Sequence, residues 1–132
     1  MIIADIKDYL ESIPVVTCDI YLVRATQKAL QSSAPYVVIN KVSNVAAHAF
    51  GGDTGFQRDR IQFTVVGNSY MEVNDIVGDL RTLFATYNES DSANLMGTTW
   101  VQSTEIANEV SDWTLQSENF FTVLDVFFNY ID

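Results

Sequence analysis

The sequence predicts an α+β domain in which a curved, antiparallel sheet of about five strands carries two helices, in the order α-β-β-β-α-β-β. Three observations predict this class. Two stretches place apolar residues at helical spacing, residues 58–67 alternate between apolar and polar side chains, and residues 119–131 form an apolar run rich in aromatic residues. A chain of 132 residues, 48% of them hydrophobic, has the size and composition of one domain spanning residues 1–132.

The first helix is predicted over residues 2–13. Ile2, Ile6 and Tyr9 recur at the spacing of one helical face, and charged residues fill the other face. Pro14 ends the helix, because proline disfavours a helical conformation in the residue before it.

Two strands are predicted next, at residues 18–25 and 35–43, because both stretches are rich in β-branched and aromatic side chains. Residues 36–39 are apolar on both faces, which is typical of a strand that is covered on both sides. Residues 44–57 contain three glycines, and their length of fourteen residues is long for a hairpin connection. We therefore expect a long loop at residues 44–57.

The clearest strand is predicted at residues 58–67, and a second helix at residues 70–87. The apolar residues that alternate in the strand are Ile61, Phe63 and Val65. Ser69 and Glu72 have the spacing of a capping box, which marks a helix start. The apolar stripe of the helix comprises Val73, Ile76, Val77, Leu80, Leu83, Phe84 and Tyr87.

The last part of the chain combines two predicted strands with an acidic segment at residues 88–118. Residues 98–107, within that segment, are predicted to be a strand of mixed polarity. Residues 119–131 are predicted to be the final strand. This strand is apolar on both faces along most of its length, and such a strand needs cover on both faces. The second cover is either a helix of the same chain or a neighbouring subunit.

The charge of the chain is unevenly distributed. There are 7 basic and 17 acidic residues, which gives a net charge of −10, and no basic residue follows Arg81. The acids after Arg81 are Glu89, Asp91, Glu105, Glu109, Asp112, Glu118, Asp125 and Asp132. This balance excludes a C-terminal half that grips nucleic acid through its phosphates, and it disfavours adhesion to an anionic membrane.

The sequence contains little that predicts catalysis. Cys18 is the only cysteine and His48 the only histidine, so a disulfide within the chain or a cysteine-based zinc site is excluded. Asp75 and Asp79 could form half of a carboxylate site, but a solvated helix face explains them better. We expect no enzyme activity, no cofactor, no metal, no signal peptide and no membrane-spanning segment.

Tryptophans and glycines offer two further weak signals. Trp100 and Trp113 flank acidic residues and could hold a cationic ligand, although packing is the commoner role of tryptophan. The stretch Gly51–Gly55 resembles a phosphate-binding loop in composition alone. It lacks the lysine before a serine or threonine, and it lies between two predicted strands.

Three stretches resemble the tail-completion (tail-terminator, head–tail joining) proteins of long-tailed bacteriophages. They are Ala34–Val42 (Ala-Pro-Tyr-Val-Val-Ile-Asn-Lys-Val), Arg58–Val73, in which an alternating strand turns into a Ser-Tyr-x-Glu helix start, and the closing apolar strand Phe120–Tyr130. Together with the leading helix they cover most of residues 1–131. Residues 88–118 depart from the family pattern.

The resemblance implies a structural virion protein that forms a ring, a hexamer in the family. Such a ring is assembled in the host cytoplasm, caps the tail tube and joins it to the head connector. The implied partners are other copies of the chain, the major tail-tube protein and a head-completion or connector protein. DNA would pass through the ring without specific binding, and no membrane is involved.

The candidate site residues are those that would make contacts in a ring. The candidate contact loop comprises Val45, His48, Phe50, Gly51, Gly52, Gly55 and Phe56. The candidate subunit interface comprises Phe121, Val123 and Phe127 on the last strand. The candidate acidic lumen or partner surface comprises Glu105, Glu109, Asp112 and Glu118. Acids that line a bore would keep DNA from adhering.

Two alternatives remain open from the sequence. One is a small acidic domain that binds a ligand in a pocket between sheet and helix. The other is an adaptor that engages a basic partner through residues 88–132, in which case binding should weaken with salt.

Overall fold

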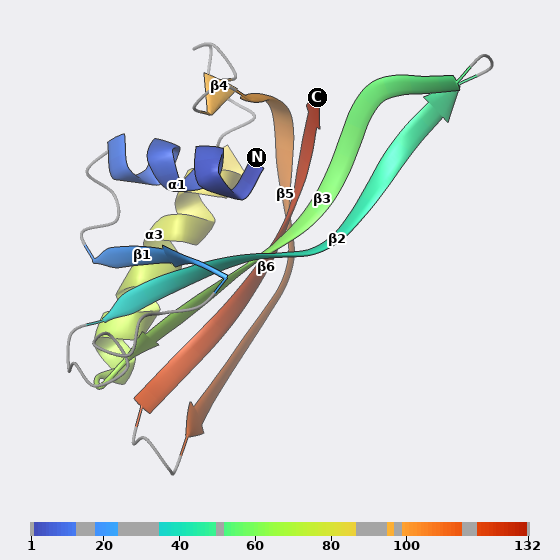
Figure 1. Cartoon of the computed structure of the whole chain (residues 1–132). Coiled ribbons are helices and arrows are strands. Elements are labelled where there is room, and N and C mark those ends of the chain that lie inside the picture. The colour runs from blue at the N-terminus through green and yellow to red at the C-terminus, as the bar shows by residue number, and fades with distance from the viewer. Residues whose placement is uncertain are drawn as a thin grey trace.

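The computed structural model describes residues 2–12, 18–23, 35–49, 52–86, 95–96, 99–114 and 119–131. These residues form two helices and six strands (Figure 1). The elements are α1 (Ile2–Ser12), β1 (Asp19–Leu22), β2 (Tyr36–Ala49), β3 (Gly52–Gly67), α3 (Tyr70–Thr86), β4 (Leu95–Met96), β5 (Thr99–Thr114) and β6 (Asn119–Ile131). The α+β class and the two helices are confirmed, and β4, a strand of two residues, is an addition to the predicted order.

The strands form one mixed sheet in the order β1-β2-β3-β6-β5-β4. β1 runs parallel to β2, with Asp19 opposite Tyr36, whereas the other neighbouring strands are antiparallel. The prediction of an antiparallel sheet is therefore wrong at this pair. Parallel neighbours need a connection long enough to return the chain to the same end of the sheet, and residues 23–35 lie between these two strands.

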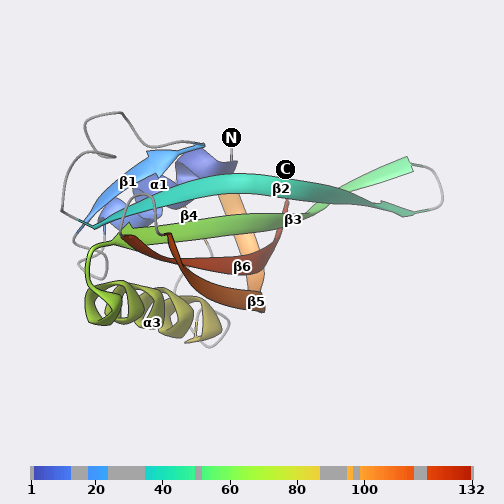
Figure 2. The same ribbon diagram turned by 90° about the horizontal axis from the view of Figure 1, so that it is seen from below.

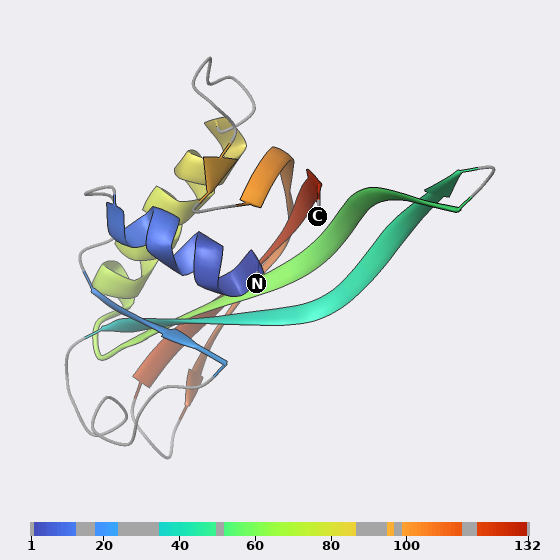
Figure 3. The ribbon, with the colours of Figure 1, turned by 45° about the horizontal axis from the view of Figure 1, so that its top comes forward.

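Both helices pack on the same face of the sheet (Figure 3). Phe63 of β3, Phe84 of α3 and Phe128 of β6 meet at its centre, with neighbouring ring centroids 5.1 to 6.1 Å apart. The rest of the buried core comprises Ile2, Ile3, Ile6, Leu10, Ile20, Val37, Ile39, Ile61, Val65, Val73, Val77, Leu80, Val101, Leu124, Val126 and Tyr130. Neither α1 nor α3 is long and apolar enough to cross a membrane.

The predicted helices and the final strand are confirmed almost to the residue. The amide of Val73 donates to the carbonyl of Ser69 over 3.1 Å, which closes the first turn of α3 at the predicted capping box. Gly67 lets the chain turn tightly before this helix, because a Cβ there would lie only 3.0 Å from Cγ2 of Val73. Tyr87, the last member of the predicted stripe, lies outside the described residues.

The prediction of a long loop at residues 44–57 is wrong. β2 continues to Ala49 and β3 begins at Gly52, so residues 44–49 and 52–57 form the two strands of a hairpin, which we call the arm. The arm leaves the sheet and projects away from the helices (Figures 1 and 2). These residues lack a strict alternation, but each strand supplies the hydrogen-bonding partner of the other, with Val45 opposite Arg58 and a register shift between Ala46 and His48.

β5 is also longer than predicted. It extends to Thr114 rather than residue 107, because most of the acidic stretch that follows pairs with β6, as Asn108 does with Asp125 and Asp112 with Phe121. The cross-strand partner therefore outweighs the low strand propensity of these polar residues.

Candidate assembly surface

The face of the sheet opposite the helices, which we call the open face, carries an apolar patch. Cross-strand neighbours share a face, and alternate residues point to opposite faces. Phe127 of β6 therefore points away from the buried Phe128, and Val123 points away from the buried Leu124. The patch comprises Val38, Val66, Val110, Phe121, Val123 and Phe127, all half-buried except Val110, which is 51% exposed. No helix within the described ranges covers it.

Charged residues cross the open face beside this patch. Arg58 donates to Glu105 over 2.8 Å, and its guanidinium carbon lies 4.2 Å from the ring centroid of Phe127. Arg60 forms an ion pair with Asp125, which is buried. Side chains of β5 and β6 thus hold the two arginines of β3, and the position of the Arg58 cation over the Phe127 ring is favourable.

Two atoms of this charged row have no hydrogen-bond partner although they are buried. They are Nε of Arg60 and Oδ1 of Asp125, and they are the only such side-chain atoms in the part of the chain that the structure describes. Buried polar atoms are normally paired. The open face is therefore less complete in its polar contacts than the face under the helices.

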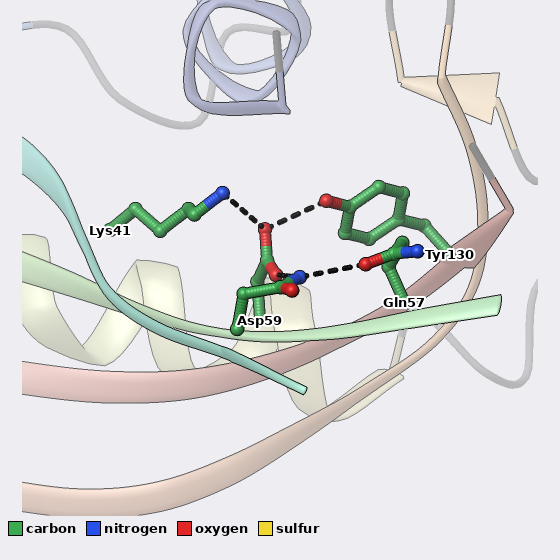
Figure 4. Close-up of polar contacts among 5 residues, drawn as sticks. Lys41, Gln57, Asp59 and Tyr130 are labelled. Carbon is green, nitrogen blue, oxygen red and sulfur yellow. Dashed lines mark hydrogen bonds and ion pairs between the residues drawn. The ribbon is translucent and has the colours of Figure 1, made fainter. Parts of the chain in front are cut away.

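A second polar cluster lies at the root of the arm, on the face that the helices cover (Figure 4). Asp59 of β3 is fully buried there and accepts a hydrogen bond from the hydroxyl of Tyr130 over 2.8 Å. The side-chain amide of Asn44 donates to the same carboxylate and, over 2.9 Å, to Oε1 of Gln57. The ammonium of Lys41 lies 3.7 Å from Oδ2 of Asp59.

This cluster joins β2, β3 and β6 where the arm leaves the sheet. A buried carboxylate is destabilising unless it is hydrogen-bonded and neutralised, and three neighbours do this for Asp59. Its hydrogen bonds and its ion pair join the three strands and fix the root of the arm. No group of three or more potential metal ligands occurs among the described residues.

The sequence prediction did not include Asp59, although a signal for it exists. Ile61, Phe63 and Val65 set the buried face of β3, and Asp59 lies two residues before Ile61 in the same alternation. A charged residue on a buried stripe predicts a polar partner, and Tyr130 supplies one from β6.

The structure places the predicted interface residues together. Phe121, Val123 and Phe127 share the open face of β6, with Arg60 opposite Phe127 and Thr64 opposite Val123. β6 is thus apolar on both faces, as the sequence predicts, and no helix among the described residues covers the face that carries Phe121, Val123 and Phe127.

The predicted acidic residues are not brought together in the same way. Glu105 lies on the open face against Arg58, whereas Glu109 lies on the other side of the sheet, 2.9 Å from Arg81 of α3. Asp112 lies on β5 opposite Phe121, but its side chain is outside the description, as is the whole of Glu118. Glu105 and Glu109 therefore do not form one surface.

Five of the seven predicted contact residues lie on the arm. Val45, His48, Gly52, Gly55 and Phe56 belong to its two strands, where His48 lies opposite Asp53. Their side chains are not described, and Phe50 and Gly51 lie outside the described residues. Of the weaker signals, Asp75 and Asp79 are both exposed on α3, which agrees with a solvated helix face.

The fold defines a sheet with helices on one face, an open second face and a projecting arm. No protein-family model matches the sequence, and no curated protein is significantly similar to it. Among solved structures, the chain is similar to a chain of a structure described as the virion of a native gene transfer agent (GTA) particle. The TM-score is 0.72 at 9% sequence identity, and the match covers 98% of this chain and 93% of that one. At this identity the likeness concerns the fold.

Proposed function

We propose that this chain is a structural protein of a phage-like virion, which assembles with copies of itself into a ring, a hexamer by the resemblance. The ring caps the tail tube and joins it to the head connector, so its partners are the tail-tube protein and a head-completion or connector protein. DNA passes through the ring without specific binding. The function is assembly, and no catalysis or cofactor is part of it.

The observation that carries this proposal is the open face. Apolar side chains such as Phe121, Val123 and Phe127 remain only half-buried, although Leu124, Val126 and Phe128 on the opposite face of β6 are fully buried. An apolar patch with a polar rim is typical of a protein interface. Arg58 and Arg60, which are already paired with Glu105 and Asp125 beside the patch, would form part of that rim.

The comparison with solved structures supports a virion as the setting. The matched chain belongs to a virion particle, and the match extends over nearly the whole of both chains. The family resemblance of Ala34–Val42, Arg58–Val73 and Phe120–Tyr130 supports the tail end of a virion more specifically. The adaptor alternative is less well supported, because Glu105 and Glu109 lie on opposite faces and each is paired with an arginine.

Mass measurement and electron microscopy test the proposal. The purified chain, alone and mixed with tail tubes, should form rings of defined mass that lie at one end of each tube. Val123→Glu should abolish the rings while the variant still unfolds cooperatively. The matched control is Met71→Glu, which places the same charge on a 71% exposed position of α3 and should leave the rings unchanged. A chain that stays monomeric with tubes present would contradict the proposal.

A further inference from the structure

Among the described strands, the arm pairs almost entirely with itself. Residues 44–49 of β2 pair with β3 alone, and β6 reaches the arm only at Phe56 and Gln57. A two-stranded hairpin is marginally stable in water unless another element packs against it. The arm, which projects away from the helices in Figures 1 and 3, is therefore a segment that a neighbouring molecule would stabilise.

The composition of the arm suits a contact with an apolar surface. Residues 45–56 include one acid, Asp53, and no lysine or arginine, and six of these twelve residues are alanine or glycine. Strands that stay exposed at the margin of a sheet usually carry charged side chains, lysine above all. Small uncharged residues instead let a strand approach another backbone closely.

The patch on the open face is about as long as the arm. Along β6 the patch extends from Phe121 to Phe127, which is about 20 Å at the rise of a strand. Residues 44–49 of the arm span about 20 Å by the same rise. A hairpin with almost no charge can cover this patch without burying an unpaired charge on it, which would be costly.

The arm cannot cover the patch of its own chain. β2 and β3 run without a break between the sheet and the arm, so the arm leads away from the sheet in the direction of these strands. Phe121 of the patch pairs with Val66 of β3, whereas the arm reaches only to Gln57 of the same strand. The distance from Gln57 to Val66 along β3 is about 30 Å. A contact between arm and patch therefore joins two copies of the chain.

A contact of this kind has a direct consequence for symmetry, because it uses two different surfaces. Each copy places its arm on one neighbour and receives the arm of the other neighbour on its patch. Such a head-to-tail contact repeats around an axis and closes into a ring. Two patches packed against each other would instead give a twofold dimer and would leave both arms without a partner.

The polar cluster around Asp59 prepares the arm for such a contact. It joins the root of the arm to β6 through Tyr130 and to β2 through Asn44, so the arm leaves the sheet in a fixed direction. A segment that is already held in position loses less conformational entropy when it binds.

We propose that the arm of one copy lies across the open face of the neighbouring copy and covers its apolar patch. The occupant of the patch is thus a second copy of this chain. The inference rests on the proposed ring, and it specifies which two surfaces join neighbouring subunits.

Cysteine cross-linking in the assembled ring tests the contact directly. In a Cys18→Ser background, Val123→Cys on the patch is combined in turn with one arm substitution, which is Val45→Cys, Ala46→Cys, Ala47→Cys or His48→Cys. Every copy then carries one thiol on each of the two surfaces. A short bismaleimide should therefore link successive copies around the ring, and at least one arm position should give a ladder of covalent oligomers on a denaturing gel.

The matched control replaces Val123→Cys by Asp75→Cys, on the exposed side of α3, and should give no ladder. Rings of normal mass that give no ladder from any arm position would overturn the contact and leave the proposed ring intact. Covalent dimers without larger products would indicate a twofold contact and would also overturn it. The absence of any ring from the natural chain would overturn the proposed function as well.

A shortened arm gives a second test. A variant in which Asn-Gly replaces residues 47–56 leaves Ala46 and Gln57 opposite each other across a two-residue turn, and it retains the cluster around Asp59. The core is unchanged, so thermal unfolding should stay close to that of the natural chain. Ring formation should require about tenfold more protein or a still higher concentration, because the patch loses its cover. A shortened chain that forms rings at the same concentration as the natural chain would overturn the contact.

Discussion

The two faces of the sheet are built from the same strands, yet one is covered by the helices and the other has no helix over it among the described residues. Leu124, Val126 and Phe128 are fully buried under the helices, whereas Val123 and Phe127 on the other face of the same strand are only half-buried. Both faces of β6 carry apolar side chains, so the difference lies in what covers each face. The helix-covered face should therefore determine stability, and the open face should determine assembly.

The sharpest test of this division compares two neighbouring phenylalanines. Phe128→Ala removes a ring packed against Phe63 and Phe84, and we expect it to lower the free energy of unfolding by about 3–5 kcal/mol. Phe127→Ala removes a half-exposed ring, and we expect a loss of about 1 kcal/mol. Urea denaturation measures both.

Assembly should respond in the opposite order. At a temperature where both variants remain folded, Phe127→Ala should lose ring formation and Phe128→Ala should retain it. Equal losses of stability for the two variants would mean that the open face is covered within the chain, and the division between the faces would be wrong.

A buried aspartate on each face gives the next comparison. Asp59→Ala should cost about 2–3 kcal/mol, because the buried hydroxyl of Tyr130 loses its acceptor and the hydrogen bond from Asn44 is also lost. Asp125→Ala should cost about 1 kcal/mol, because its partner Arg60 is 39% exposed and can be hydrated instead.

Asp59→Asn is the control for this pair. It keeps an oxygen that can accept from Tyr130 and should recover part of the loss, which chemical denaturation can measure. In addition, Asp59→Ala should speed hydrogen exchange along the arm, because the cluster holds its root. An arm whose exchange does not change would show that the cluster stabilises only the core.

The sequence predicts those features of this fold that depend on residues close together in the chain. The stripe of α3 from Val73 to Phe84 and the helix start after Ser69 are local patterns, and the structure confirms both. Local patterns do not predict the arm. Its two strands lack a regular alternation of apolar and polar residues, and they form because they pair with each other. The direction of β1 depends on how residues 23–35 return the chain, which periodicity does not encode.

The candidate surface was predictable in part for the same reason. The two-sided apolar pattern of residues 119–131 predicts that the last strand needs a second cover. The pattern does not predict that both helices pack on the same face of the sheet, because this depends on how the whole chain packs. The open face with Phe121 and Phe127 is the result of that choice, and Asp59 was detectable only by following the buried alternation of β3 to its end.

The smallest expected effect concerns Cys18, which packs at the edge of the helix-covered core. Burial, the largest cause, raises the pKa of its thiol from 9.0 to about 11. The folded chain therefore holds this proton more tightly than the unfolded chain, so the contribution to stability is complete below pH 9 and is lost as the pH rises toward 11. Between pH about 8 and about 10, the free energy of unfolding should fall slightly more for the natural chain than for Cys18→Ser, in which the shared titration of tyrosines and lysines is retained.

The thiol should also react slowly with an alkylating reagent at pH about 8 until denaturant is added, because the thiolate is the reactive form. Rapid alkylation in the folded state would mean that this edge of the core opens. The helix-covered face would then not be closed to solvent near β1.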